Sequence, residues 1–198
     1  MRCFCHNLMK KKLINNMEFY YCSNCGYLKK INIPTLEQEK SRYDLHICDE
    51  GYQKYMNCVF NNVKPYLING ESLDFGCGKI HLLSDILNAN GFSCSYYDLF
   101  YYNDLKFKKY DNIILIEVFE HINDTYDLIK KLLSMLSENG RIIVMTKFIP
   151  KDLNNWWYLR DITHVSFVGI KSIQALAKAF NLKAIIDENN SLFVLSRI

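Results

Sequence analysis

Residues 73–78 read Leu-Asp-Phe-Gly-Cys-Gly, and this hexapeptide most constrains what the chain can fold into. An apolar strand is expected to end here and to hand over to a helix. Glycine lets the backbone turn tightly and approach a ligand closely, because it has no Cβ atom. An acid stands two residues before the first glycine, at the end of the strand. The pattern predicts a nucleotide-like ligand at the carboxyl ends of parallel strands.

Strands and helices alternate after residue 50, which predicts an α/β fold with a Rossmann-like, mostly parallel sheet and helices on both faces. The expected strands are 71–75, 93–98, 112–117 and 141–146, and the expected helices are 51–68, 80–90, 124–136 and 171–180. Asn139-Gly140 predicts a turn before the strand at 141–146. Residues 182–186 and 192–195 are expected to form a final antiparallel pair.

The chain has 198 residues and is 49% hydrophobic, enough for one α/β domain and a small extra module. We expect a zinc-knuckle-like module at 1–30, a linker at 31–50 and the main domain at 51–198. The apolar runs are too short to cross a bilayer, and residues 10–12, all lysine, precede no long apolar stretch. Neither a membrane span nor a secretory signal is therefore expected. The scattered cysteines after residue 30 indicate a reducing compartment, so a cytoplasmic location is expected.

The first 25 residues contain a group of potential metal ligands, which are Cys3, Cys5, His6, Cys22 and Cys25. The spacing Cys22-x-x-Cys25 lets both thiolates reach one zinc ion. The other half of the site pairs Cys3 with Cys5 or with His6. Both sets stay open, and the set with Cys5 is preferred. Such a zinc would be structural, because no ligand position is left open for water. A metal-free arm is the alternative.

Asp98 ends the second expected strand, 24 residues after Asp74. An acid at about this distance from a glycine-rich turn is placed to bind ribose hydroxyls. Nicotinamide enzymes and methyltransferases both use this arrangement, and a plain turn acid is the alternative interpretation. The short glycine turn, followed by Lys79-Ile80 in place of a further glycine, favours S-adenosylmethionine over a dinucleotide. The segment 117–122, Glu-Val-Phe-Glu-His-Ile, favours it as well.

The chain resembles the class I S-adenosylmethionine-dependent methyltransferases, especially the branch related to ubiquinone-biosynthesis O-methyltransferases. The segments that carry the resemblance are 73–78, 97–98, 110–122, 138–146 and 157–167, so it spans roughly residues 50–198. Relatives in this branch often begin with a cysteine-rich segment. One departure is Ile80, which stands where the family often has a third glycine.

The resemblance implies a set of cofactor contacts. Gly76 and Gly78 would lie against S-adenosylmethionine, Asp74 near its methionine end and Asp98 on its ribose hydroxyls. The backbone at Ile116-Glu117 would border the sulfonium, and Asp104-Leu105 would flank the adenine.

Glu117, Glu120 and His121 follow the central strand within about one turn. Two carboxylates and an imidazole suit a hard or borderline divalent metal, which would activate an acceptor hydroxyl. In the resembled O-methyltransferases and in small-RNA 2′-O-methyltransferases, a Glu-x-x-Glu-His segment can bind a divalent ion with a later histidine, and His164 is such a residue. Three interpretations stay open: a metal site of Glu117, Glu120, His121 and His164, a catalytic base at His121 or His164 without metal, and a structural role.

The long loop 147–168 carries Trp156, Trp157 and Tyr158, which either line an acceptor pocket or pack as core. Arg160 and Asp161 are expected to pair with each other. The preferred function is methyl transfer to an oxygen of a small molecule or saccharide.

Other functions compete with this one. Residues 1–30 carry six Lys or Arg and one Glu, a net charge of +5, which supports the alternative of a zinc-ribbon RNA-binding protein or RNA methyltransferase, although a solvated lysine-rich surface is the preferred interpretation of this charge. No extended basic face with interleaved aromatic residues supports nucleic-acid binding in the rest of the chain. A nicotinamide oxidoreductase and a non-catalytic homologue, the latter motivated by Ile80, are the remaining alternatives.

Overall fold

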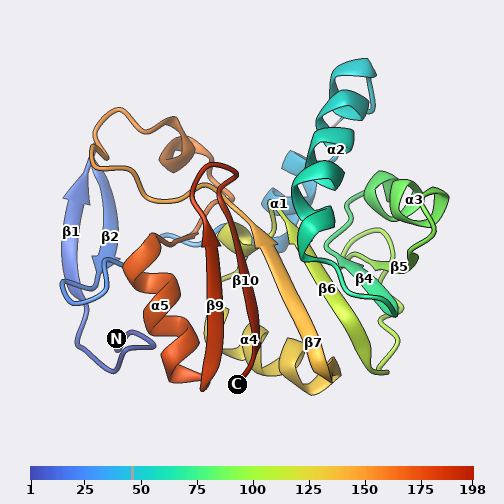
Figure 1. Cartoon of the computed structure of the whole chain (residues 1–198). Coiled ribbons are helices and arrows are strands. Elements are labelled where there is room, and N and C mark those ends of the chain that lie inside the picture. Colours follow the sequence, from blue (N-terminus) through green and yellow to red (C-terminus); the bar gives the residue numbers. More distant parts are fainter. Residues whose placement is uncertain (46) are drawn as a thin grey trace.

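The computed structural model describes residues 1–45 and 47–198, and a large twisted sheet forms its centre (Figure 1). The strand order is β5-β4-β6-β7-β10-β9. The strands are β4 (Glu71–Phe75), β5 (Ser93–Tyr97), β6 (Tyr110–Ile116), β7 (Leu136–Met145), β9 (Leu182–Asp187) and β10 (Leu192–Arg197). β4 pairs in parallel with β5 and β6, β6 pairs in parallel with β7, and β10 is antiparallel to both of its neighbours. The predicted, mostly parallel sheet with an antiparallel C-terminal strand is confirmed.

Helices cover both faces of this sheet. The elements on one face are α2 (Glu50–Val63), which runs into the 3-10 turn η1 (Lys64–Tyr66), and α3 (Leu82–Ala89); those on the other are α4 (Thr125–Met135) and α5 (Ile170–Ala179). Successive residues of β6 point to opposite faces. Ile113 accordingly packs in the cluster of α4 and α5, and Ile114 in that of α2 and α3. Among the described residues, no helix is both long and apolar enough to cross a membrane.

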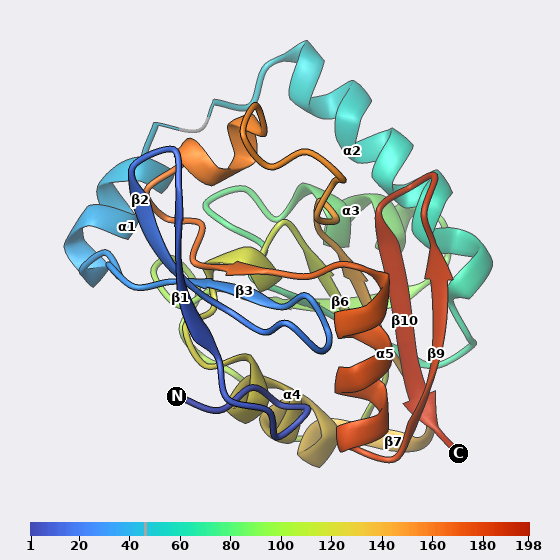
Figure 2. The ribbon, with the colours of Figure 1, turned by 90° about the vertical axis from the view of Figure 1, so that its left-hand side faces the viewer.

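A second, smaller sheet joins the N-terminal region to the loop after β7 (Figure 2). Its order is β1 (Lys10–Ile14), β2 (Met17–Tyr21), β3 (Leu28–Lys30) and β8 (Ser166–Phe167). All of its pairings are antiparallel. Phe19 and Leu28 share a buried cluster with Tyr158 and Phe167. The first 30 residues therefore pack on the rest of the chain through a common sheet and a common core.

The segment 31–50, expected to be a linker, contains the helix α1 (Leu36–Tyr43). Thr35 caps its N-terminus, and the side chain of Gln38 accepts a bond from the Thr35 amide in return, which forms a capping box. None of the residues 36–43, all of which the structure describes, is buried. This helix therefore lies on the surface of the molecule.

The prediction of a turn at Asn139-Gly140 is wrong, because both residues lie inside β7. β7 begins at Leu136, and its register against β6 shifts between Tyr110 and Asn112. A Cβ atom on Gly140 would come within 2.8 Å of the Leu136 Cγ. The glycine thus permits close packing at an irregular point of the strand. The predicted helix at 80–90 begins two residues later, at Leu82.

Candidate active site

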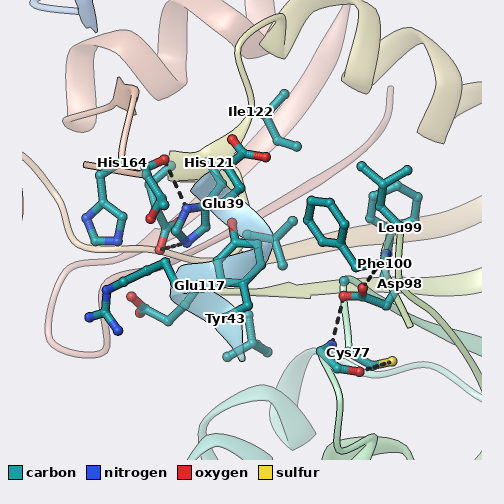
Figure 3. A pocket seen from close by; sticks show the side chains of 18 of the residues that line it. Glu39, Tyr43, Cys77, Asp98, Leu99, Phe100, Glu117, His121, Ile122 and His164 are labelled. Carbon is teal, nitrogen blue, oxygen red and sulfur yellow. Dashed lines mark hydrogen bonds and ion pairs between the residues drawn. The ribbon is translucent and has the colours of Figure 1, made fainter. Parts of the chain in front are cut away.

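A cavity of about 690 Å³ opens at the carboxyl ends of β4, β5 and β6 (Figure 3). The chain runs from β4 to β5 on one side, whereas β6 pairs with β4 on the other side. Ligands bind at such a topological switch point in open α/β sheets. The volume falls within the range of small-molecule sites. The lining comes from the glycine turn, the loop after β5, the segment after β6, the helices α1, α2 and α4, and the loop 157–164.

Two left-handed glycines shape the turn after β4. Gly76 has a φ of +87° and Gly78 a φ of +70°, values that other residues rarely adopt. A Cβ atom on Gly76 would lie 2.5 Å from a methyl carbon of Val118. The amides of Gly76 and Cys77 donate to the carbonyl of Tyr97 at 2.7 and 3.1 Å, which ties the turn to the end of β5. The predicted turn thus brings its backbone to the cavity wall.

Asp98, at the end of β5, holds two loops together. One carboxylate oxygen accepts the Gly78 amide at 3.0 Å, and the other accepts the amides of Phe100 and Tyr101 at 2.8 and 3.2 Å. Each carboxylate oxygen can accept further hydrogen bonds. The carboxylate is therefore fixed on the cavity wall with capacity for hydroxyl donors, which fits a ribose.

Residues just after Asp98 extend the cavity wall. Leu99 and Phe100 line the cavity. Asp104, which the family resemblance places beside an adenine, is exposed and pairs with Lys106. Sequence reasoning missed Leu99 and Phe100, although both are apolar residues that directly follow the strand-end acid.

Asp74 is a buried carboxyl at the end of β4 and lines the cavity. Burial, together with the nearby charge of Asp98, raises the pKa of Asp74 to about 7. The carboxyl therefore titrates close to neutral pH in the folded protein.

Glu117 and Glu120 meet at one tyrosine hydroxyl. Glu117 follows β6 with a φ of +51°, an uncommon value for a residue other than glycine. Glu120, in the 3-10 turn η2 (Phe119–His121), is fully buried. The hydroxyl of Tyr158, in η3 (Trp157–Arg160), lies 2.8 Å from Glu117 Oε2 and 2.5 Å from Glu120 Oε1. Thr146 donates to the other Glu120 oxygen at 2.9 Å.

A single hydroxyl proton cannot serve both carboxylates of this bridge. Both hydrogen bonds form together only when one of the two glutamates is protonated. Burial, together with the charge of Glu117, raises the pKa of Glu120 well above its usual range. The raised pKa favours the protonated form of Glu120, and in that form its carboxyl donates to Tyr158 while Tyr158 donates to Glu117. This bridge could not be anticipated from the sequence, because Tyr158 lies about 40 residues from both glutamates.

His121 and His164 are oriented in the same way. Each Nδ1 donates to a main-chain carbonyl, that of Thr163 at 3.1 Å for His121 and that of Tyr158 at 2.9 Å for His164. A carbonyl only accepts hydrogen bonds, so Nδ1 carries a proton in both rings. The ring centroids are 4.8 Å apart. Burial lowers the pKa of His164 to about 4, so this ring is neutral at physiological pH.

The structure thus brings the predicted site residues together. Ligand atoms of Glu120, His121 and His164 all lie within 4.8 Å of one another. Glu117 joins this group through the hydroxyl of Tyr158.

Helix α1 adds residues that sequence reasoning missed. Glu39, Arg42 and Tyr43 line the cavity, and Figure 3 shows Glu39 and Tyr43. The ring of Tyr43 lies 5.2 Å from that of His121 and 5.7 Å from that of Phe100. Positions three and four apart lie on one helix face. The capping box and this spacing were therefore signals that could have found them.

Arg42 forms an ion pair that was expected of Arg160. Its guanidinium lies 3.2 Å from Asp161 Oδ2, whereas the neighbouring Arg160 is exposed. The other Asp161 oxygen accepts the amide and the hydroxyl of Thr163 at 3.0 and 2.7 Å. The prediction of an Arg160–Asp161 pair is therefore wrong, and Asp161 links α1 to the loop that carries His164.

Of the two tryptophans in the loop, one lines the cavity and the other packs against the core. Trp157 lines the cavity and is 61% exposed. Trp156 packs on Tyr158 and Phe167, with ring centroids 5.2 and 5.6 Å away. Trp157 is therefore a rim residue, and Trp156 belongs to the packing beneath it.

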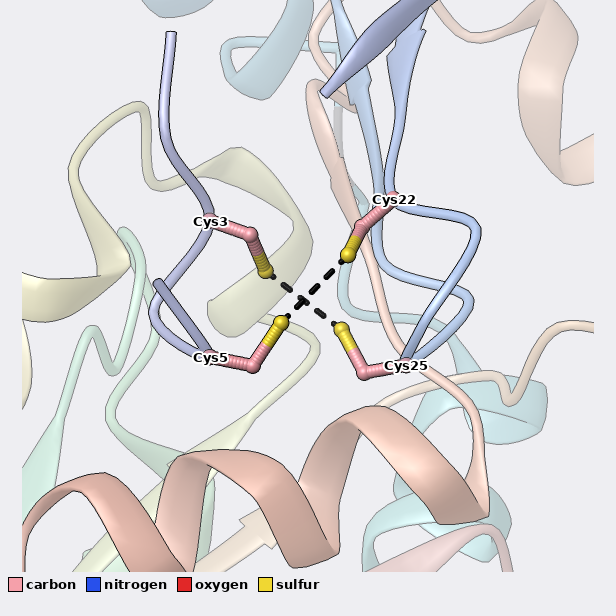
Figure 4. Close-up of side chains that lie close together, drawn as sticks. All are labelled: Cys3, Cys5, Cys22 and Cys25. Carbon is pink, nitrogen blue, oxygen red and sulfur yellow. Dashed lines mark hydrogen bonds between the residues drawn. The ribbon is translucent and has the colours of Figure 1, made fainter. Parts of the chain in front are cut away.

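Four N-terminal thiols converge on one point (Figure 4). Cys3 Sγ lies 3.4 Å from Cys25 Sγ, Cys5 Sγ lies 3.4 Å from Cys22 Sγ, and all four atoms lie within 4.8 Å of one another. The hydrogen bond from Cys3 lowers the pKa of Cys25 to about 5, and the same bond raises that of Cys3. His6 is exposed. The geometry thus favours Cys5 over His6 as the fourth member of the set.

The chain is similar to a known protein family and to several solved structures. A methyltransferase-domain family model matches residues 52–186. No curated protein is significantly similar to the chain. An S-adenosylmethionine-dependent methyltransferase from Thermotoga maritima, a possible histamine N-methyltransferase, is 12% identical with a TM-score of 0.53, over 82% of this chain and 96% of that one. LaPhzM is 13% identical with a TM-score of 0.52, over 74% and 55%.

A further structure is that of YcgJ from Bacillus subtilis, 18% identical with a TM-score of 0.44 over 59% of this chain. The chain spans 63% of the length of YcgJ. At these identities the structural matches show the fold alone.

The chain belongs to the methyltransferase-domain family, because the family match covers more than half of its length. Its Rossmann-like α/β fold is shared with the Thermotoga maritima structure, at a TM-score of 0.53.

The pKa of Asp74 predicts how stability depends on pH. Its pKa is about 7 in the folded protein and 3.8 for the free group, so between these values the unfolded chain binds fewer protons. The free energy of unfolding therefore falls as the pH rises from about 4 to about 7. Asp74→Asn should remove this loss and be more stable than wild type at pH 8, by on the order of 3 kcal/mol.

Urea unfolding at pH 5 and pH 8 measures the effect. The matched control is Asp104→Asn, which leaves the buried carboxyl intact. Equal pH dependence in wild type and Asp74→Asn would contradict the assignment.

Proposed function

We propose that the chain transfers the methyl group of S-adenosylmethionine to an oxygen of a small molecule or saccharide. One observation carries this proposal: a single cavity joins the glycine turn and Asp98 to the pair His121 and His164. The first end suits a nucleoside, and the second end offers imidazole nitrogens that can take a proton. Methyl transfer to a hydroxyl needs both, since the acceptor must be held near the sulfonium and lose its proton.

The residues present fit the cofactor. Gly76 and Gly78 would lie against it, Asp98 would accept hydrogen bonds from its ribose hydroxyls, and Asp74 would lie near its methionine end. The backbone of Glu117 would border the sulfonium. When bound, the cofactor supplies an electrophilic methyl group. The turn supports this role, because a Cβ atom on Gly76 would collide with Val118 and the backbone there lies open to the cavity.

His164 or His121 would act as the base. As the acceptor oxygen bonds to the methyl carbon, its proton would move to an imidazole Nε2, and the bond from sulfur to the methyl carbon would break. Burial keeps His164 neutral, so its Nε2 can accept a proton. The carbonyls of Tyr158 and Thr163 fix both rings in the required tautomer.

A divalent ion on Glu117, Glu120, His121 and His164 is part of this proposal. The ligand atoms of Glu120, His121 and His164 are close enough to share one ion, and mixed oxygen and nitrogen donors suit Mn²⁺ or Mg²⁺. Bound there, the ion would lower the pKa of an acceptor hydroxyl.

We also propose a structural zinc on Cys3, Cys5, Cys22 and Cys25. Zinc–sulfur bonds of about 2.3 Å imply sulfur atoms roughly 3.8 Å apart in a tetrahedron. The observed closest pairs at 3.4 Å come near to this value.

The cofactor prediction is tested by calorimetry. S-adenosylmethionine should bind and NAD should not. Asp98→Asn should weaken binding on the order of 10- to 100-fold, because a charge-assisted hydrogen bond to the ribose is lost. Asp104→Asn is the matched control and should bind like wild type. Absence of S-adenosylmethionine binding at about 1 mM would overturn the proposed function.

The zinc prediction is tested by metal analysis of the purified chain. We expect one zinc per chain in wild type and its loss in the double variant Cys22→Ser/Cys25→Ser, because two of four thiolates are removed. Cys48 and Cys58 are exposed, so Cys48→Ser/Cys58→Ser is the matched control and should keep its zinc. Zinc retained in the first variant would refute the site.

The divalent ion is tested with Mn²⁺, whose electron paramagnetic resonance signal weakens when it binds to protein. Wild type should bind one Mn²⁺, and Glu120→Gln should lose it because an amide is a much poorer ligand. The exposed Glu138 gives the control Glu138→Gln. Equal binding by wild type and Glu120→Gln would argue for a base that works without metal.

A further inference from the structure

Lys30 is a buried lysine at the end of β3. Its residue is 7% exposed, and its ammonium donates to the main-chain oxygen of Asp161 at 2.7 Å. Burial lowers the pKa of Lys30, and the charge of Asp161 acts in the opposite direction. Burying an ammonium group costs free energy, so a buried lysine is expected to make specific interactions that offset this cost.

The bond from Lys30 falls on the turn 161–164. The Asp161 oxygen that accepts the ammonium also accepts the amide of His164 at 3.3 Å. The Asp161 carboxylate closes the turn from the other side, through its two bonds to Thr163. The ammonium thus fixes the start of a short turn that ends in His164.

The same turn orients both imidazoles of the site. The Thr163 carbonyl within it accepts from His121 Nδ1, and His164 at its end donates to the Tyr158 carbonyl. A displacement of the turn would therefore loosen both carbonyl contacts that select the Nδ1–H tautomers.

The backbone of Lys30 anchors the same stretch of chain. Its amide donates to the Val165 carbonyl at 2.8 Å, and the Val165 amide donates to the Glu120 carbonyl at 2.7 Å. On the same strand, Leu28 pairs with Phe167 and Lys29 with Ser166. The side chain of Lys30 thus adds one hydrogen bond to a strand pairing that already holds residues 165–167.

We propose that Lys30 is a positioning residue for the methyl-transfer site, a proposal that rests on the proposed function: its ammonium holds the turn 161–164 so that the Nδ1–H groups of His121 and His164 keep their carbonyl partners. The N-terminal module would then serve the active site as a scaffold. The competing interpretation is that Lys30 contributes only to overall stability.

Long-range ¹H–¹⁵N correlation spectra of the histidine rings separate these interpretations, because they report the tautomer of each ring directly. The full chain is used with and without S-adenosylhomocysteine, and His121→Gln and His164→Gln assign the two signals. Wild type should show the Nδ1–H tautomer for both rings. Lys30→Met should shift the ring nitrogens of both toward the average of the two tautomers. Lys30→Arg, which keeps a cationic donor, should restore the wild-type pattern.

Lys12 on β1 is exposed and provides the control Lys12→Met, which should leave the spectrum unchanged. Wild-type tautomers in a folded Lys30→Met variant would overturn the proposal, whatever its loss of stability. If Lys30→Met does not fold, Lys30→Gln is measured against the same two outcomes. The spectra without ligand do not depend on cofactor binding, so failure of the proposed function, seen by calorimetry, is distinguished from failure of this proposal.

Discussion

The structure around the candidate site depends on two main-chain hydrogen bonds made by one buried residue, Val165. Its amide donates to the Glu120 carbonyl and its carbonyl accepts the Lys30 amide. Lys30, Glu120 and Val165 belong to three distant parts of the sequence. A short stretch of chain is thereby fixed between the end of the central sheet and the N-terminal sheet. His164 directly precedes Val165, so its position follows from both sheets together.

Helix α1, which also lines the cavity, is held mainly by contacts near the surface. None of the described residues 36–43 of α1 is buried, and apart from the ring contacts of Tyr43 with Phe100 and His121 its links to the body are polar. Arg42 pairs with Asp161, and the Tyr101 hydroxyl donates to Asp44 at 2.7 Å. Partly exposed ion pairs contribute only about 0–1 kcal/mol. The turn that carries His164 is therefore fixed by buried main-chain hydrogen bonds, whereas α1 has few buried contacts, and regions of this kind are the ones in which local opening costs the least free energy.

Local pattern was enough to predict the central sheet from the sequence. The strand at 71–75 was placed at its observed bounds, and most other elements within a few residues, because their periodicity and flanking turn residues agree. The carboxyl ends of β4, β5 and β6 then bring Asp74, Asp98 and Glu117 to one cavity. The turn predicted at Asn139-Gly140 is absent because tertiary packing against Leu136 overrides the usual turn preference of this dipeptide.

The remaining parts of the site depend on contacts between distant residues, which local pattern does not contain. Arg42 and Asp161 are 119 positions apart, and β8 spans only two residues. A pairing this short carries no periodicity. Residues 1–30 looked separate because of their cysteines and charge, yet Tyr27 is buried and its hydroxyl lies 2.9 Å from that of Ser166 in β8. Composition therefore indicated a module but could not show what it packs on.

The Glu-x-x-Glu-His segment by itself does not decide between a metal site and a metal-free base, and the buried carboxyl of Glu120 explains why. Burial makes an isolated charge there costly, so the carboxyl must be neutralised. A proton does this while Tyr158 bridges Glu120 to Glu117, and a divalent cation held with His121 and His164 would do the same. In both cases the same buried carboxylate is neutralised, so a cation must displace the proton in order to bind. The metal affinity proposed for this site would therefore be coupled to protonation of Glu120, and the competition between the two would decide which chemistry the segment supports.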